Sequence, residues 1–371
     1  MKNFIAGKLT RLDSLTSFRF IAALMVYLFH VGIWSEFQTG YIGVSFFFIL
    51  SGFILTYNYS NKLIHLDKKM VGKFYIARFS KIYPIHLLTF FLAVPYYFFI
   101  PLKHEPILYV FQAITNITLI HSWIPFGNIS FNGVSWSLSN EMFFYMILPL
   151  VIMCGYKFRT KKLVLGVVIA GFSLLLLTTL ILLPPTNNFS RWFAYYFPVT
   201  RSLEFIIGIF LGFVFLRTKN LKMNVPRGIF TTIEVITLSL LILIIILSPN
   251  VLQNLRYGMV FIPFMGLLII AFAFQKGLLS RLLSNKVLIY LGEISFSFYM
   301  IHNLVLSYIF FLWKPQINQN LLIVICLLLS IILSSIMYHF YEEPMRIKVK
   351  NRLGSKFSTD QSVVETNKKV V

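Results

Sequence analysis

Long uninterrupted runs of apolar residues constrain the fold of this chain more than any other feature. The runs are about 16 to 25 residues long, and a helix of that length crosses a hydrocarbon layer about 30 Å thick. Hydrophobic residues make up 58% of the 371 residues and charged residues only 12%, against about 25% charged in ordinary soluble domains. We therefore expect an all-α, polytopic transmembrane helical bundle.

About ten runs are predicted to span the membrane. A further stretch, 106–121, is short and carries Gln112, Thr115, Asn116 and Thr118, so we expect it to lie in or on the outer interface without crossing. The predicted spans are 18–33, 40–58, 82–101, 141–155, 163–183, 199–216, 229–247, 258–274, 287–312 and 320–341.

The distribution of basic residues sets the predicted orientation. A net charge of +21 would by itself suit a nucleic-acid-binding protein. The Lys and Arg residues collect instead in alternate short loops between the apolar runs, and such loops stay in the cytoplasm. This pattern argues against nucleic acid as a partner and predicts a multi-pass protein of the cytoplasmic membrane with both termini inside. The lipid bilayer is its expected surrounding, and its oligomeric state stays open.

Two domains are predicted, a membrane domain over residues 1–346 and a basic, disordered cytoplasmic tail over 347–371. The first run has no cleavage site and is expected to be a retained helix. Cys154 and Cys326 both lie in apolar runs, which favours two small buried side chains over a disulfide. No spacing typical of zinc ligands occurs, so no bound metal is expected.

Ionisable residues inside the apolar runs are candidates for function, because such a group costs at least about 2.5 kcal/mol in hydrocarbon. His30 lies near the outer end of the first run and suits either a general base that activates a hydroxyl or a histidine hydrogen-bonded between helices. Glu141 follows Ser137 by four residues, enters a run from the outer surface, and needs a partner such as His30, Arg201 or water. The neighbouring Trp136 alone is typical of an interfacial belt.

Two cations precede the third run. Arg78 and Lys81 are three residues apart, so they share a helix face at the cytoplasmic surface. They suit either a clamp for a phosphate-bearing ligand or ordinary cytoplasmic anchoring.

Polar residues also recur in the later runs. Arg201 and Glu204 are three residues apart and are expected to neutralise one another as a structural ion pair. Ser295, Tyr299 and His302 lie at helical spacings and form a polar stripe, which lines a cavity or binds other helices.

Taken together, these segments resemble acyltransferase family 3, the OafA-like membrane O-acyltransferases of bacteria. The similarity begins at the turn containing Asp13 and at the helix that closes with His30, and it includes Ser51 in the second run. The other similar segments are Arg78–Pro84, Trp136–Glu141, Arg201–Gly208, Gly292–His302 and Glu343–Pro344.

This chain differs from the family pattern in three respects. The family's paired arginines are here Arg78 and Lys81, which keeps the charge and loses one bidentate fork. Ser45 stands where an acidic residue often follows the Gly-Val of the second run. Many relatives carry an extracytoplasmic SGNH-type domain after the last span, and none is expected here.

The resemblance implies an enzyme that transfers an acyl group, commonly acetyl, from a cytoplasmic acyl-coenzyme A to a hydroxyl of a cell-surface or lipid-linked carbohydrate acceptor. Acetyl-coenzyme A or another acyl-coenzyme A would be a donor substrate, with no cofactor bound permanently. In this interpretation Arg78 and Lys81 bind the donor. His30 deprotonates the acceptor or carries the acyl group, and Glu141 orients the imidazole. The expected supporting residues are Asp13, Ser51, Trp136, Ser137, Arg201, Glu204, Ser295, Tyr299 and His302.

Two other functions fit the residues. A secondary transporter or flippase would use His30, His302 and Glu141 as a proton or substrate path. An acyltransferase with a small secondary metabolite as its acceptor would need the same catalytic residues.

Overall fold

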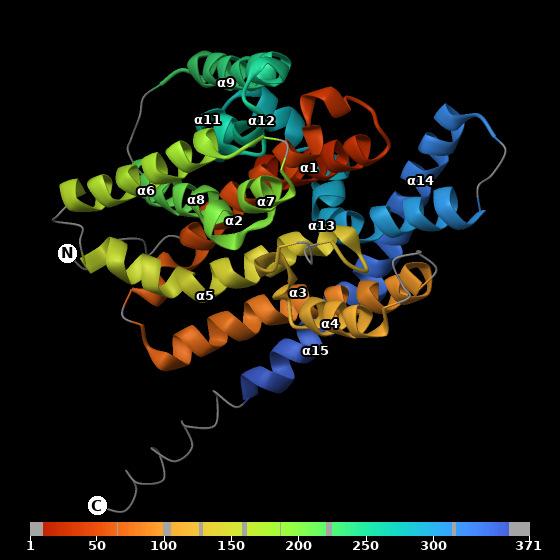
Figure 1. The fold of residues 1–371 in the computed structure, drawn as a ribbon. Coiled ribbons are helices and arrows are strands. Elements are labelled where there is room, and N and C mark those ends of the chain that lie inside the picture. The colour runs from red at the N-terminus through yellow and green to blue at the C-terminus, as the bar shows by residue number, and fades with distance from the viewer. Residues whose placement is uncertain are drawn as a thin grey trace, which may run out of the picture.

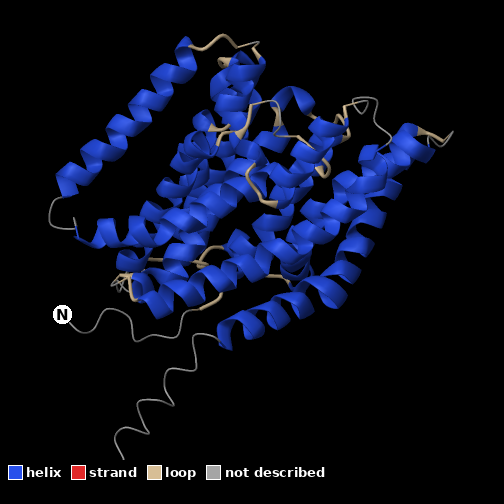
Figure 2. Cartoon of the chain, turned by 60° about the horizontal axis from the view of Figure 1, so that its bottom comes forward, coloured by secondary structure: helices blue, strands red, loops and turns tan. Residues whose placement is uncertain are grey.

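A computed structural model describes residues 10–64, 66–98, 105–125, 129–157, 162–185, 187–219, 225–313 and 317–355. All regular secondary structure in these ranges is helical, which confirms the predicted all-α class (Figure 2). The long helices are α1 (Asp13–His30), α2 (Thr39–Leu63), α3 (Lys68–Phe98), α5 (Trp136–Lys157), α6 (Lys162–Leu182), α8 (Pro198–Thr218), α9 (Arg227–Leu247), α13 (Lys286–Leu306) and α14 (Gln319–Met337).

Shorter segments connect and extend these helices. The short α-helices are α4 (Pro106–Ile117), α7 (Asn188–Arg191), α10 (Gln253–Arg256), α11 (Ile262–Ala273), α12 (Leu278–Leu283) and α15 (Glu343–Gly354). The 3₁₀ turns are η1 (Ser35–Phe37), η3 (His121–Trp123), η4 (Gly133–Ser135), η6 (Ser248–Asn250) and η7 (Met259–Phe261). The π-helical turns are η5 (Trp192–Tyr196), η8 (Ser307–Trp313) and η9 (Tyr338–Glu342).

The predicted spans coincide with helices throughout the described residues. α1 and α3 begin at Asp13 and Lys68, earlier than the predicted 18 and 82, because each helix continues into a polar segment at one end. In the described part of the chain, six segments are long and apolar enough to cross a membrane, and the predicted count of ten and the orientation stay predictions. The six are Thr39–Leu63, Gly133–Gly155, Asn188–Thr218, Arg227–Asn250, Lys286–Phe310 and Gln319–Gly354.

The stretch predicted to lie at the interface forms α4. Its 12 residues extend about 18 Å, well short of a hydrocarbon core. Ile107, Val110 and Ile114 are exposed on it, while Asn116 is buried. After α4 the chain turns back through η3 without forming a full span.

Asparagine side chains start three helices. Asn187 accepts a hydrogen bond from the Phe189 backbone N–H at 2.9 Å, and Asn285 accepts one from Val287 at 2.8 Å. Asn318 caps α14 in the same way. Each cap satisfies a donor that the first helical turn leaves unpaired.

The centre of the bundle is formed by α1, α2, α8 and α13, while α9, α11 and α12 gather at one edge (Figure 1). Close approach of these central helices depends on glycine. A Cβ added at Gly52 would lie 2.1 Å from the Phe205 carbonyl oxygen, and one at Gly208 would lie 2.0 Å from that of Ile49. Likewise, a Cβ at Gly292 of α13 would lie 2.0 Å from the carbonyl oxygen of Thr16 on α1. Small residues of this kind allow membrane helices to pack backbone against backbone.

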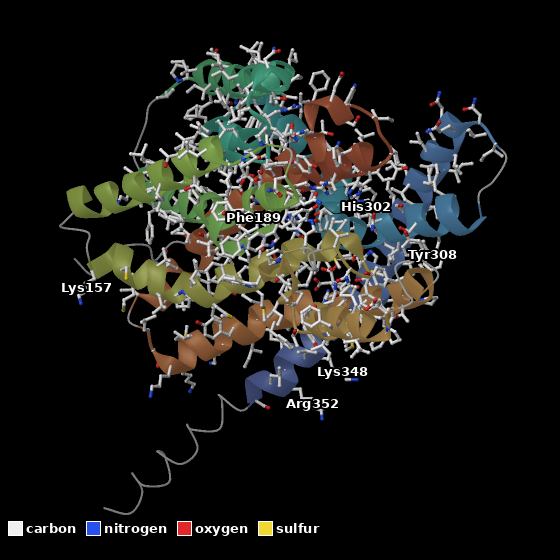
Figure 3. The ribbon with its side chains drawn as sticks, in the orientation of Figure 1. Lys157, Phe189, His302, Tyr308, Lys348 and Arg352 are labelled. Atoms are coloured by element: carbon white, nitrogen blue, oxygen red, sulfur yellow. The ribbon has the colours of Figure 1, made fainter. Side chains whose placement is uncertain are left out.

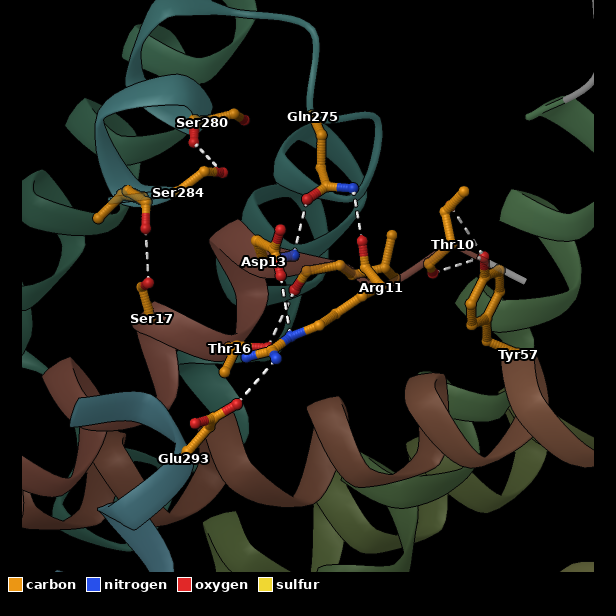
Figure 4. Close-up of polar contacts among 12 residues, drawn as sticks. Thr10, Arg11, Asp13, Thr16, Ser17, Tyr57, Gln275, Ser280, Ser284 and Glu293 are labelled. Carbon is orange, nitrogen blue, oxygen red and sulfur yellow. Dashed lines mark hydrogen bonds and ion pairs between the residues drawn. The ribbon is translucent and has the colours of Figure 1, made fainter. Parts of the chain in front are cut away.

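Polar contacts anchor the beginning of α1 (Figure 4). Arg11 forms ion pairs with Asp13 at 2.9 Å and with Glu293 of α13 at 2.8 Å. The Asp13 backbone N–H donates to Gln275 Oε1 at 2.7 Å, and Ser17 donates to the Leu283 carbonyl. Asp13, expected as a supporting residue, therefore lies in this anchor.

The end of the chain corrects one prediction. α15 continues to Gly354, so residues 347–354 of the expected disordered tail are helical. Residues 356–371 lie outside the described ranges. Lys348 and Arg352 project from α15 at the rim, whereas His302 lies within the bundle (Figure 3).

Replacing Gly208 with alanine is expected to lower the apparent unfolding temperature of the detergent-solubilised protein. The added methyl group would force α2 and α8 apart, and overpacking of this kind typically costs about 1–3 kcal/mol. Gly171→Ala on α6 is the matched control, because an added Cβ there meets nothing within 4 Å. Equal unfolding temperatures for the two variants in fluorescence-detected size-exclusion chromatography would contradict the close packing of α2 on α8.

Candidate active site

His30 and His302 form a hydrogen-bonded pair at the ends of two central helices. His30 Nδ1 lies 3.0 Å from His302 Nε2, although the residues are 272 positions apart. The two rings are nearly parallel, with an interplanar angle of 16°. His302 is fully buried and His30 is exposed, so the buried His302 ring holds the accessible His30 ring in place through this hydrogen bond. The structure thus joins two residues that the sequence placed on separate spans.

The hydrogen bonds assign a tautomer to each ring. His302 Nδ1 lies 3.0 Å from the Phe298 carbonyl oxygen, which can only accept, so this nitrogen carries the proton. His302 Nε2 is then unprotonated and accepts a hydrogen bond from the N–H at His30 Nδ1. His30 Nε2 is left with a free lone pair, as a general base requires.

A cavity of about 550 Å³ lies beside His30; we name it the histidine cavity. About half of the described residues that line it are aromatic, and Arg191 is the arginine among them. His30 also borders a more open space of about 480 Å³ together with Ser307 and Gln319. The base is therefore accessible to a substrate.

A second cavity of about 170 Å³, the arginine cavity, contains Arg19, Arg78, Lys81 and Glu141. Ser51 and Ser137 also line it. Arg19 further borders a space of about 340 Å³ at the beginning of α1, next to Arg11. Basic side chains therefore extend from Arg11 at the beginning of α1, through Arg19, to Arg78 and Lys81 in the arginine cavity.

Lys81 differs from the two arginines of this cavity. Its ammonium pairs with Glu342, a buried carboxylate that also accepts a hydrogen bond from Ser297. Arg78 meets no described carboxylate within ion-pair distance, and instead donates to the Tyr59 hydroxyl at 3.4 Å and lies over the rings of Tyr59 and Tyr145. Lys81 is thus neutralised by a direct ion pair, whereas Arg78 forms no direct ion pair in the described chain and shares its cavity with Glu141.

Glu141 does not lie where the sequence interpretation placed it. It accepts a hydrogen bond from the Tyr145 hydroxyl at 2.8 Å and faces the arginine cavity, so it does not orient the His30 imidazole. That position is held by His302. Sequence spacing put Glu141 and Ser137 on one helix face correctly, but it carried no information on which cavity this face lines.

The two cavities meet at Val44 and Tyr299, which line both. The Tyr299 hydroxyl donates to the Val134 carbonyl at 3.1 Å, which fixes the ring between the cavities. Arg19 and His30 are eleven residues apart on α1, about three turns, so they lie on one face of that helix about 16 Å apart. One helix therefore presents a cation to the first cavity and the base to the second.

The other predicted residues form structural contacts or lie beside the cavities. Arg201 and Glu204 form the expected ion pair at 3.1 Å, both buried, and Arg201 also donates to Ser45 at 3.0 Å. Trp136 is buried beside the histidine cavity and is not an interfacial belt residue. Ser295 donates to the carbonyl of its own helix at Gly292 and lines none of the cavities described above.

Sequence reasoning missed two residues of this site, Arg19 and Glu342. Arg19 precedes His30 by three helical turns inside an apolar run, a spacing that would have placed both on one face. Glu342 lies in a Glu-Glu-Pro segment, and nothing local indicates which of the two glutamates turns inward. Among the described residues, no group of His, Cys, Asp or Glu could hold a metal ion.

Comparison with known proteins decides the family. The family model described as an acyltransferase domain, acyltransferase family 3, matches residues 12–339. The chain belongs to this family. It is 32% identical over 327 residues to the acyltransferase MdmB of Streptomyces mycarofaciens, covering 81% of this chain and 80% of that protein. No solved structure matches it.

A second relative is the peptidoglycan O-acetyltransferase OatA of Listeria monocytogenes. Identity is 27% over 354 residues, which is 90% of this chain and 55% of that protein. This chain thus spans about half the length of the Listeria relative. It is a multi-pass membrane enzyme of the acyltransferase class, as expected from the sequence, and the family does not favour the alternative of a transporter.

A double-mutant cycle can measure the interaction energy between Lys81 and Glu342. Glu342→Leu alone is expected to destabilise the solubilised protein, because it leaves the Lys81 ammonium without its partner. Lys81→Met combined with Glu342→Leu should recover part of that loss, with a coupling energy of about 0.5–3 kcal/mol. Thermal unfolding of the four proteins measures the coupling, and strictly additive effects would show that the ion pair contributes nothing.

Proposed function

We propose that this protein is a membrane O-acyltransferase that moves an acyl group from acyl-coenzyme A to a hydroxyl of a carbohydrate. The observation that carries the proposal is the arrangement of the two adjoining cavities, one bordered by unpaired arginines and the other by the free Nε2 of His30. The family and its O-acetyltransferase relative support the same reaction class.

In the proposed reaction the acceptor hydroxyl lies in the histidine cavity. His30 Nε2 removes the hydroxyl proton as the oxygen attacks the thioester carbonyl carbon. The new C–O bond forms, the C–S bond breaks, and the proton passes from the imidazolium to the leaving thiolate. His302 stabilises the transient positive charge on His30, because His302 Nε2 accepts the hydrogen bond from His30 Nδ1–H throughout the reaction. A two-step transfer through an acyl-histidine uses the same atoms.

The donor enters, in this proposal, from the predicted cytoplasmic side. Arg19 and Arg78 would bind the phosphates of the coenzyme, because guanidinium groups suit phosphate oxygens and neither arginine forms a direct ion pair with a described carboxylate. The pantetheine arm would then follow the 16 Å or so of α1 between Arg19 and His30. Tyr299 and Val44 stand at the point where the thioester passes from one cavity to the other.

His30→Ala is expected to reduce acyl transfer by about 10²- to 10⁴-fold, the usual contribution of a general base. The assay follows the label from radioactive acetyl-coenzyme A into membrane glycan, using purified protein reconstituted in nanodiscs. His339→Ala is the matched control, since His339 on η9 contacts Tyr290 of α13 and borders neither cavity. Full activity of the His30 variant would remove this residue from the chemistry.

Arg78→Ala is expected to raise the KM for acetyl-coenzyme A by about 10- to 100-fold, the value of a lost charge-assisted hydrogen bond. With acetyl-pantetheine, which lacks the nucleotide phosphates, the variant and the wild type should have similar KM values. Arg227→Ala, at the exposed start of α9, serves as the control for loss of charge. An equal loss with both donors would show that Arg78 does not recognise phosphate.

A further inference from the structure

The histidine cavity carries a positive charge for which the described part of the chain supplies no counter-charge. Arg191, from α7, lines the cavity and is exposed. Its described contacts are with Tyr196, whose hydroxyl it reaches at a long 3.4 Å and whose ring centre lies 5.9 Å away. None of the described residues that line this cavity is an aspartate or a glutamate.

Several other cations of this protein have a partner within the chain. Lys81 pairs with Glu342, and Arg201 pairs with Glu204. Arg256 donates hydrogen bonds to the backbone carbonyl of Glu36 and to the side chain of Gln253. Arg191 is therefore an unneutralised guanidinium that faces a cavity, which suits a carboxylate or a phosphate brought by a ligand.

The walls of the cavity suit the ring of a sugar. Trp136 packs against Tyr195 and Tyr196 with ring centres 4.5 and 4.9 Å apart, and Tyr41 lies 4.3 Å from Tyr195. Such side chains combine a flat apolar face with a hydrogen-bonding tip. Further hydrogen-bonding side chains on the wall are Ser130, Asn303 and Ser307.

We propose that the histidine cavity selects an anionic carbohydrate, whose carboxylate or phosphate pairs with Arg191 while its ring packs on the aromatic wall and one hydroxyl faces His30. This inference rests on the proposed function and names the class of its acceptor. A neutral sugar would leave the guanidinium unpaired, and a cationic sugar would be repelled by it.

The test measures binding without an acyl donor, so it does not depend on turnover. Four phenyl β-D-glucosides that differ only at C6 are titrated into the full-length protein in nanodiscs by isothermal calorimetry. They carry a carboxylate, a phosphate, a hydroxyl or an ammonium group. The two anionic glucosides are expected to bind at least about tenfold more tightly than the neutral one, and the difference between them identifies the preferred anion.

Variants of Arg191 then test whether this residue causes the preference for anionic glucosides. Arg191→Gln should make the anionic and neutral glucosides bind equally, Arg191→Lys should keep a preference for the anions, and Arg191→Glu should favour the ammonium glucoside. Arg256→Gln is the matched control and should retain the wild-type order, because Arg256 does not line the cavity.

Three results would overturn the inference. These are equal binding of charged and neutral glucosides by the wild type, no binding of any of the four, and an equal weakening of all four by Arg191→Gln, which would mean that Arg191 only supports Tyr196. If Arg191→Gln does not fold, the Lys and Glu variants still decide the sign of the preference. Acyl transfer to an anionic glycan at an unchanged rate in Arg191→Gln would refute this inference while leaving the proposed function intact.

Discussion

The contact on which the candidate site depends is the packing of α1 against α13. Gly292 lies so close to the Thr16 carbonyl that any side chain there would separate the two helices. Because van der Waals packing rather than hydrophobic burial holds helices together in lipid, such backbone contacts set helix positions. This contact keeps the far ends of both helices together, where His30 meets His302. The position of the base thus follows from a glycine on another helix.

Electrostatics in a medium of low dielectric constant explains the arrangement of charges. Buried carboxylates meet donors: Glu204 pairs with Arg201, Glu342 with Lys81, and Glu234 of α9 accepts the backbone N–H groups of Gly277 and Ser280 at the start of α12. A buried charge without a partner would be costly. Arg19, Arg78 and Arg191 form no ion pair with a described carboxylate, and each lines a cavity in which a ligand can supply negative charge.

Irregular helical turns carry residues that line the histidine cavity and the carboxylate that pairs with Lys81 of the arginine cavity. Three π-helical turns, η5, η8 and η9, carry Tyr195 and Tyr196, Ser307, and Glu342. A π turn inserts one extra residue and rotates the side chains that follow it, and such turns are frequent at functional sites. In this protein they direct aromatic rings, a hydroxyl and a carboxylate toward the space between helices.

The sequence by itself determined the fold class and the helices. An apolar run of membrane length must satisfy its own backbone hydrogen bonds in lipid, and an α-helix does so within a single segment. It also singled out His30 and Arg78 as candidate site residues and predicted the Arg201–Glu204 pair, since an ionisable residue in or beside an apolar run is conspicuous and a spacing of three is a local property. Only the tertiary structure decided that His302 supports His30, that Glu141 lies with the arginines, and that Lys81 is neutralised by Glu342. Those pairings join helices far apart in the chain, and helical periodicity fixes a residue's face without fixing the helix that the face meets.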